Sequence, residues 1–169
     1  MRHVKLSLVL AFAFGLAACG QSGPSTAQRA QQTADALTGD AAGDAASNPQ
    51  CKMFTLTEIA TYLGAPAKLG TNAAMGTGCQ WTGVTNDGAQ FVSLQIVDAR
   101  YHEPPKLAAG FKKLTDVGSK GFVVPGIGGW EAGAIQGDKS INVVTSGATT
   151  SEAQTIAFLR EAVKRVGEK

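Results

Sequence analysis

Few side chains in this sequence could carry out catalysis once the N-terminal segment is set aside. Beyond the first 20 residues there is one histidine, His102, and it lies beside Glu103 in a polar stretch. Acid–base catalysis needs such a group held against a substrate, and nucleophilic catalysis needs a serine or thiol beside a base. No serine or aspartate stands in a recognisable nucleophile motif, and the acidic residues are scattered. The sequence therefore predicts no catalytic or metal-binding site and no cofactor.

A glycine-rich segment with Gly126, Gly128 and Gly129 is the second candidate for chemistry. A phosphate-binding loop needs a strand, the glycines and then a helix N-terminus, whereas Trp130 begins a predicted strand here. We therefore expect a tight turn before a hairpin. The tryptophan is either a core plug or an exposed anchor for a partner, and we favour the anchor. The predicted partner-binding residues are Pro125, Gly126, Ile127 and Trp130.

Residues 1–18 have the organisation of a cleaved export signal. Basic residues at Arg2 and Lys5 lead into an apolar run that ends in small residues. This run is too short to span a bilayer, which is typical of a secretory signal peptide rather than a membrane helix.

Residues 16–19, Leu-Ala-Ala-Cys, resemble the lipobox of bacterial lipoproteins. The resemblance implies that the Cys19 thiol is diacylated, that the signal is removed before it, and that the new amino terminus is acylated, for example with palmitate. Two or three acyl chains give stable membrane anchoring. Gly20 stands where an aspartate commonly retains such proteins at the inner membrane. In a Gram-negative host, the resemblance favours the outer membrane, facing the periplasm.

The two remaining cysteines, Cys51 and Cys79, are predicted to form a disulfide in the oxidising envelope. Their spacing does not fit the Cys-x-x-Cys pattern of redox and metal sites. A bridge would close a loop of roughly 28 residues, worth about 3 to 4 kcal/mol in the chain-entropy description. Trp81 lies two residues after Cys79, on the same face of a predicted strand, so we expect it to pack over the bridge.

The formal charge of +2 does not indicate a nucleic-acid partner. Arg2 and Lys5 lie in the signal, and their removal leaves 13 basic and 13 acidic side chains. Adjacent basic residues occur in the mature chain only at 112–113 and 164–165, and both pairs are predicted to be solvated.

Composition divides the mature chain into a tether and one domain. Residues 19–49 contain small and polar residues with Leu37 as the only large aliphatic one, and cannot bury enough surface to fold. We expect a lipidated, disordered tether that holds the domain on the order of 30 Å from the bilayer. Residues 50–169 have the length of a single domain.

The sequence of the first half of this domain predicts one helix and one hairpin. Thr55 and Glu58 have capping-box spacing, so a helix is expected over residues 56–63. Strands are predicted over residues 78–82 and 89–97, joined by a turn at 85–88.

The second half predicts a helix over residues 104–114 and strands over 122–124, 130–135 and 140–144. Ser151 begins a last helix, which packs on the sheet. Its apolar stripe is Ile156, Leu159, Val163 and Val166. Together these elements predict an α+β fold: a small antiparallel, possibly mixed, sheet of about five strands, two or three helices, and one disulfide.

Three segments carry a family resemblance: a cysteine ahead of the 56–64 segment Leu-Thr-Glu-Ile…Leu-Gly, the Cys-Gln-Trp of 79–81, and the Val-Pro-Gly-Ile-Gly of 124–128. They resemble an actinobacterial family of cell-envelope lipoproteins and sensor-like domains of unknown function. The resemblance covers most of residues 50–145 and implies a disulfide-pinned α+β domain. Gly129 and Trp130 depart from the acidic residue and alanine that the family often carries there.

These patterns predict a membrane-anchored, non-enzymatic lipoprotein that binds a protein or small ligand in the envelope. An alternative in the same class is an immunity or inhibitor lipoprotein that neutralises an incoming toxin. A competing class is a hydrolase of envelope polymers, which would require His102 to meet an acidic residue from a distant part of the chain.

Overall fold

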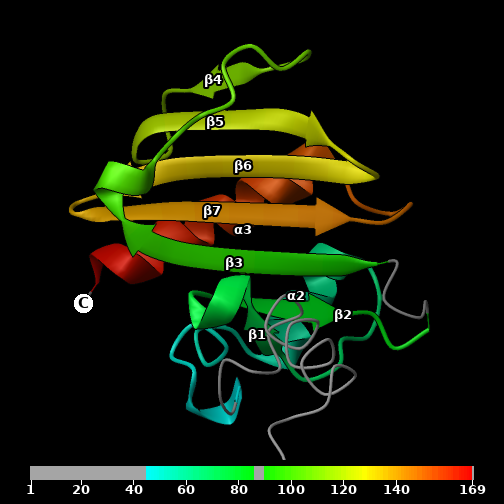
Figure 1. Ribbon diagram of the computed structural model, residues 1–169. Helices are drawn as coiled ribbons and strands as arrows, with labels where there is room; N and C mark the ends of the chain where they lie inside the picture. The colour runs from blue at the N-terminus through cyan, green and yellow to red at the C-terminus, as the bar shows by residue number, and fades with distance from the viewer. Residues whose placement is uncertain (1–44, 86–89, 169) are drawn as a thin grey trace, which may run out of the picture.

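A seven-stranded antiparallel sheet carries two α-helices on one face in the computed structural model, which describes residues 45–85 and 90–168 (Figure 1). The predicted signal, Cys19 and most of the predicted tether lie outside the described residues. Within the described part of the chain, no helix has the length and apolar character needed to cross a bilayer.

The sheet has the strand order β1-β2-β3-β7-β6-β5-β4, and every neighbouring pair is antiparallel. The strands are β1 (Thr71–Ala73), β2 (Gly78–Thr82), β3 (Phe91–Asp98), β4 (Lys112–Leu114), β5 (Ser119–Gly126), β6 (Gly129–Gln136) and β7 (Lys139–Ser146). The helices are α2 (Leu56–Leu63) and α3 (Glu152–Gly167), with short 3₁₀ turns η2 (Ala45–Ser47), η3 (Ala74–Gly76) and η4 (Ala99–Tyr101).

The predicted α+β class, the antiparallel sheet and the disulfide are confirmed. The sheet has seven strands rather than about five, because β1 and β4 add to the predicted set. Each of these two strands has three residues, too few to show an alternating pattern in the sequence. The hairpin of β2 and β3 is confirmed, while its predicted turn falls largely on residues 86–89, outside the described residues.

The helix predicted over residues 104–114 is wrong. Turns occupy this stretch up to Gly110, whose φ of +76° breaks a helix, and β4 (Lys112–Leu114) follows and pairs with β5. Leu107, placed on the predicted apolar face, is fully exposed. The Phe111 ring instead packs on the sheet, so ladder hydrogen bonds and this contact replace a weak helix.

The local signals for α2 are confirmed. The Thr55 hydroxyl accepts a hydrogen bond from the Glu58 backbone N–H, and the Glu58 carboxylate accepts one from the Thr55 backbone N–H. Gly64 ends the helix at φ +69°, a conformation that glycine adopts without strain. The buried Ile59 and Leu63 face the sheet, so α2 covers β2 and β3.

Helix α3 is also confirmed, although its most buried stripe is shifted from the predicted one. Ser151 caps the helix by accepting the Gln154 backbone N–H. The predicted Ile156, Val163 and Val166 are only half-buried. The fully buried residues of the helix are Thr155, Phe158, Leu159 and Ala162.

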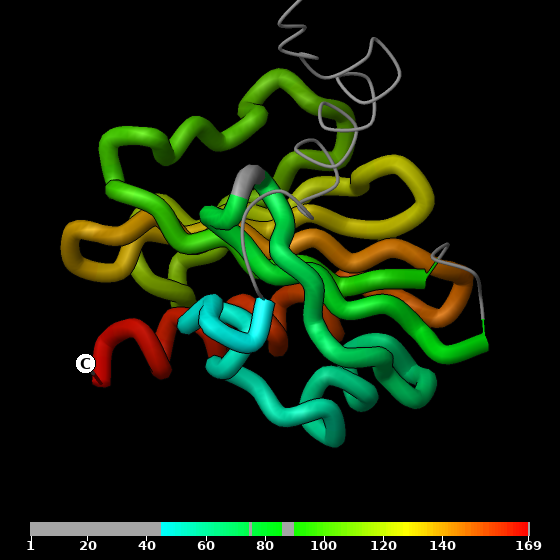
Figure 2. The backbone as a smooth tube through the Cα atoms, turned by 60° about the horizontal axis from the view of Figure 1, so that its bottom comes forward, coloured from blue at the N-terminus to red at the C-terminus, as the bar shows by residue number. Residues whose placement is uncertain are grey.

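The core lies between the helices and one face of the sheet, and it is centred on aromatic side chains. Phe54 and Trp81 both meet the Phe158 ring edge-on, with ring centroids 5.0 Å and 6.5 Å away. Figure 2 shows both helices on one side of the sheet and the segment between β3 and β4 on the other. Among the described residues, this second face carries no α-helix and is crossed by that connection, and we call it the helix-free face.

Residues 45–49 contact the domain, although the sequence assigns them to the tether. Asn48 is buried, and its side-chain amide donates hydrogen bonds to Asn72 Oδ1 and to the Gly78 carbonyl. The contacts of the described domain thus extend upstream of Gln50.

Candidate functional site

Polar side chains that could bind a ligand line cavities on the helix-free face of the sheet. The connection from β3 to β4 passes in front of β7, β6 and β5, as Figure 1 shows. Side chains on this face come from the strand positions that alternate with the core positions, such as Gln95 between Leu94 and Ile96. The crossing segment divides this face into separate cavities.

His102 pins the crossing segment to the sheet. Its Nε2 lies 3.1 Å from the Lys120 carbonyl oxygen, and its Nδ1 lies 3.1 Å from Ser140 Oγ. A carbonyl can only accept, so Nε2 carries a proton, and in the neutral ring Nδ1 accepts from the Ser140 hydroxyl. The ring also packs on Phe122, with centroids 5.8 Å apart. His102 is therefore half-buried and engaged, rather than a free surface residue.

The Ser140–His102 contact joins a hydroxyl to an imidazole, a pairing that nucleophilic catalysis uses. Such a site also needs hydrogen-bond donors aimed at a developing oxyanion. The cavity beside Ser140 instead contains the Glu131 carboxylate and Asn142, whose amide nitrogen already donates to Glu131. This surrounding disfavours an oxyanion, so we interpret the contact as a structural clamp.

Three lysines converge on a cavity of about 400 Å³ on the other side of His102. We call this cavity the lysine pocket. Its lining includes Lys106, Lys113, Lys120, Pro104, Phe111 and His102. The phenyl and proline rings supply an apolar wall, and the lysines supply positive charge at the edge.

Each lysine reaches the pocket from a different segment. Lys106 belongs to the crossing connection, Lys113 lies in β4, and Lys120 lies in β5. Lys120 has a φ of +53° and falls where the pairing of β5 with β6 shifts register, between Ser119 and Phe122. A bulge of this kind turns a side chain away from its regular direction, so it contributes to placing Lys120 at the pocket.

The charge of these lysines is not compensated within the described part of the chain. All three are exposed, and none forms an ion pair there. By contrast, the neighbouring Lys112 contacts Glu152 at 2.7 Å and Lys139 contacts Asp138 at 2.9 Å. Among the described residues, those that line the pocket include no acidic one. The lysine pocket is therefore a positively charged site with an aromatic wall.

A larger cavity, of about 560 Å³, lies at the C-terminal ends of β3 and α3. Met53, Ile96 and Val166 give it an apolar lining, and Asp138 and Lys139 stand at it as a neutral ion pair. Among the described residues that line this apolar cavity, the charged ones are paired with each other, so it offers less chemical selectivity than the lysine pocket.

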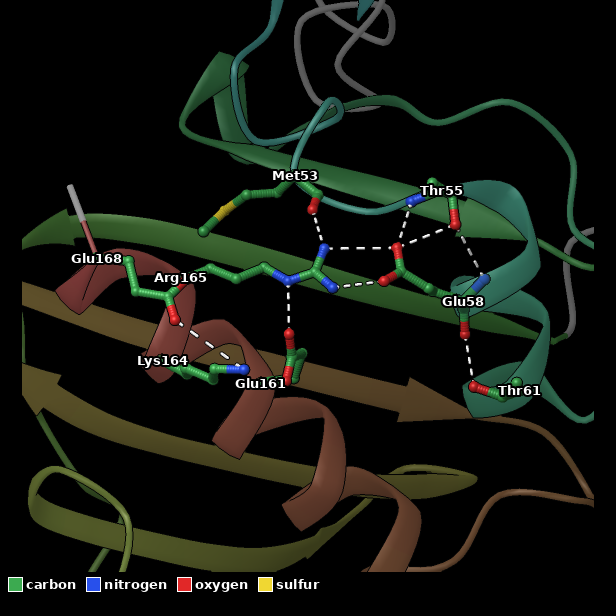
Figure 3. A network of polar contacts seen from close by, with 8 residues as sticks. All are labelled: Met53, Thr55, Glu58, Thr61, Glu161, Lys164, Arg165 and Glu168. Carbon is green, nitrogen blue, oxygen red and sulfur yellow. Dashed lines mark hydrogen bonds and ion pairs between the residues drawn. The ribbon is translucent and has the colours of Figure 1, made fainter.

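A polar network links α2 to α3 on the helix side of the sheet (Figure 3). The Arg165 guanidinium donates hydrogen bonds to Glu58, to Glu161 and to the Met53 carbonyl, and lies 4.2 Å from the centroid of the Phe54 ring. Its side chain is only 23% exposed, so the prediction that the basic pair at 164–165 is solvated is wrong for Arg165. The network lies at the edge of the core, where it links the two helices and has a structural role.

This network predicts a stability loss in acid. Hydrogen bonds from Arg165 and from the Thr55 backbone lower the pKa of Glu58 to about 2, below its ordinary value of 4.5. A carboxyl group whose pKa is lowered by folding stabilises the fold at pH values above its pKa in the unfolded state. This stabilisation is lost as the pH falls from about 4.5 towards 2. The Glu58 side chain is 40% exposed, and solvent screening reduces the contribution to about 1 kcal/mol.

Glu58→Gln should therefore lower the free energy of unfolding by about 1 kcal/mol at pH 6, with the difference from wild type vanishing near pH 2. Urea unfolding across this pH range measures it, and Glu168→Gln, at the exposed end of α3, is the matched control. An equal difference at both ends of the range would contradict the assignment.

The predicted partner-binding residues lie at the hairpin of β5 and β6. Ile127 at its tip is fully exposed, and Pro125 and Gly126 are also exposed. Trp130 is half-buried and packs against the core on the helix side, so it is neither a full plug nor a free anchor. The role of this turn in partner binding stays a prediction.

The disulfide between Cys51 and Cys79 is present, with Cα atoms 5.1 Å apart. Gly70 lies against both Cys79 Sγ and Trp81 Nε1, and Trp81 is almost fully buried, which places the indole beside the bridge as expected. Cys19 lies outside the described residues. Within those residues, no three His, Cys, Asp or Glu side chains gather closely enough to hold a metal ion.

The sequence did not reveal the lysine pocket. The lysines of the pocket are separated in the sequence by other residues. The helix predicted over residues 104–114 also gave no indication of the connection that brings them together. The only available signal was the adjacency of Lys112 and Lys113, of which Lys113 lines the pocket while Lys112 pairs with Glu152.

Comparisons of the chain with known protein families, with curated proteins and with solved structures find no match.

Proposed function

We propose that this protein is a non-enzymatic binding protein of the cell envelope, which captures an anionic ligand in the lysine pocket. The ligand class is a molecule with a phosphate or carboxylate group attached to a ring or other apolar part. The charged group contacts the lysine ammonium groups, and the apolar part lies against Phe111 and Pro104.

One observation carries this proposal: three uncompensated lysines meet at a single cavity with an aromatic wall. Like charges brought together repel one another, which raises the free energy of the unliganded protein. An anion relieves this repulsion and gains charge-assisted hydrogen bonds. The ring wall adds apolar burial, which distinguishes a ring-bearing anion from a simple salt ion.

Calorimetric titration of the full chain with phenyl phosphate tests the proposal. We expect saturable binding that weakens with added salt, weaker binding of inorganic phosphate, and no binding of phenol. Lys113→Glu should weaken phenyl phosphate binding by about tenfold or more, because it replaces an attraction by a repulsion.

Lys68→Glu is the matched control, since Lys68 is exposed and lies outside the pocket lining. It makes the same change in net charge and should leave the affinity nearly unchanged. Equal losses in the two variants would indicate only a general charge effect and would overturn the proposed site.

The anchoring part of the proposal is tested at Cys19. Lipid on this residue would hold the binding domain at the membrane, at the outer membrane and facing the periplasm in a Gram-negative host. Cys19→Ala should release the protein from membrane fractions or leave it uncleaved, and fractionation with immunoblotting measures this. A variant of mature size that stays with the membrane would contradict lipid anchoring.

A further inference from the structure

Among the described residues, the two most exposed large apolar side chains are Leu107 and Ile127, both of which are fully exposed. They lie near one contact between the crossing connection and the β5–β6 hairpin: a Cβ at Gly110 would stand only 2.8 Å from Pro125 Cγ. Leu107 is three residues from this contact and Ile127 two, so the chain places each within roughly 10 Å of it. Figure 1 shows the connection reaching β4, at the edge of the sheet opposite β1.

Smaller apolar residues continue this surface. Ala108 and Ala109 follow Leu107 and are exposed, and Pro125 is exposed beside the hairpin tip. Single exposed apolar side chains are ordinary, whereas several gathered at one place mark contact with an apolar partner. We call residues 106–113 together with residues 125–127 the docking edge.

The docking edge is positively charged. Residues 106–113 contain three lysines and no acidic residue. Lys112 is neutralised by its ion pair, but Lys106 and Lys113 form none within residues 45–85 and 90–168, and neither does Lys120 beside them in the lysine pocket. Unpaired positive charge and projecting apolar side chains therefore occur on the same edge.

This combination matches the chemistry of an anionic bilayer surface. Lipid phosphates attract unpaired lysines, and the region beneath them accepts apolar side chains without requiring a complementary shape. A nucleic acid would also neutralise the lysines, but it offers no apolar layer to Leu107 and Ile127. The acidic residue of the connection, Glu103, lines the cavity on the other side of His102 instead, so it does not oppose this match.

We propose that the docking edge binds the surface of an anionic phospholipid bilayer, with Leu107 and Ile127 inserted among the headgroups and the lysines contacting lipid phosphates. This inference rests on the same unpaired lysines as the proposed function, and it names a membrane as a partner of that site. Lipid on Cys19 would hold the edge near a bilayer, so that even a weak contact is occupied.

Nuclear magnetic resonance of the full chain tests this with nanodiscs of phosphatidylglycerol and phosphatidylcholine that carry a gadolinium-chelating lipid. The methyl signals of Leu107 and Ile127 should lose intensity. Those of Leu69 and Val84, which are exposed near β1 and β2, should keep it and serve as controls in the same sample. Nanodiscs with phosphatidylcholine as the only phospholipid, and the same gadolinium lipid, should attenuate the signals about fivefold less.

Three results would overturn the proposal. Equal attenuation at all four residues would show that no particular edge faces the bilayer. Equal attenuation by both nanodiscs would show that lipid charge has no role. Absence of attenuation, as expected if the edge meets a soluble partner, would exclude membrane docking.

The Leu107→Ser variant separates docking from binding in the lysine pocket. Leu107 is fully exposed and does not line the pocket, so the fold and the affinity for phenyl phosphate should be unchanged. Attenuation at Ile127 should fall by about fivefold or more, because the apolar side chain that leaves water is lost. Leu69→Ser, the matched control, should leave it unchanged, and equal attenuation in the two variants would count against docking.

The two proposals fail in different ways. Phenyl phosphate binding without attenuation at the docking edge would refute membrane docking and leave the proposed function standing. Attenuation at the edge without phenyl phosphate binding would refute the proposed function and leave membrane docking standing.

Discussion

Replacing Cys51 and Cys79 together by serine should lower the free energy of unfolding by about 3 to 4 kcal/mol. The bridge closes a loop with a sequence separation of 28 residues and ties the segment before α2 to β2 beneath Trp81. Its loss returns that chain entropy to the unfolded state. It also leaves a polar atom at position 79, where the cysteine is fully buried. Urea unfolding with a two-state fit measures the difference.

Reduced wild-type protein is the control for the serine substitutions themselves. It should lose most of the same stability, because the covalent link is broken while the sulfur atoms remain. Two thiols that react in the native, non-reduced protein would show that the bridge does not form.

Replacing Lys106, Lys113 and Lys120 together by glutamine should weaken phenyl phosphate binding by about 100-fold or more. Each ammonium group contributes a charge-assisted contact, and removing all three eliminates the positive field of the pocket. All three side chains are exposed, so the melting temperature should change little. Calorimetric titration and thermal unfolding of the same sample measure both quantities.

Mutation of Lys52, Lys68 and Lys164 to glutamine provides a control with the same loss of charge outside the pocket lining. Affinity should fall only slightly, through the weaker long-range field. A triple pocket variant that binds as tightly as this control would contradict the proposed function.

The helices and the long strands were predictable because their signals are local. Thr55 and Ser151 mark the starts of α2 and α3 through hydrogen bonds that span three residues. The short strands β1 and β4 were not predictable, because three residues show no periodicity and form strands only when a neighbouring strand pairs with them. The pairing of β4 with β5 also replaces the helix predicted over residues 104–114.

The candidate site was hidden for a similar reason. Its lysines are brought together by the crossing connection, by a strand pairing and by a local shift in register, and none of these has a sequence pattern of its own. The ion pair of Glu58 with Arg165 joins residues 107 positions apart, so it could not be predicted from the sequence either. His102 could be recognised as the single histidine of the domain, but its partners could not.

Intermolecular nuclear Overhauser effects between the ring protons of phenyl phosphate and the full chain locate the bound ring directly. The proposed function predicts effects to Phe111 and Pro104, the apolar wall of the lysine pocket. Effects confined to Met53, Ile96 and Val166 would place the ligand in the apolar cavity and contradict the central claim. A titration that produces no saturable signal would contradict it as well.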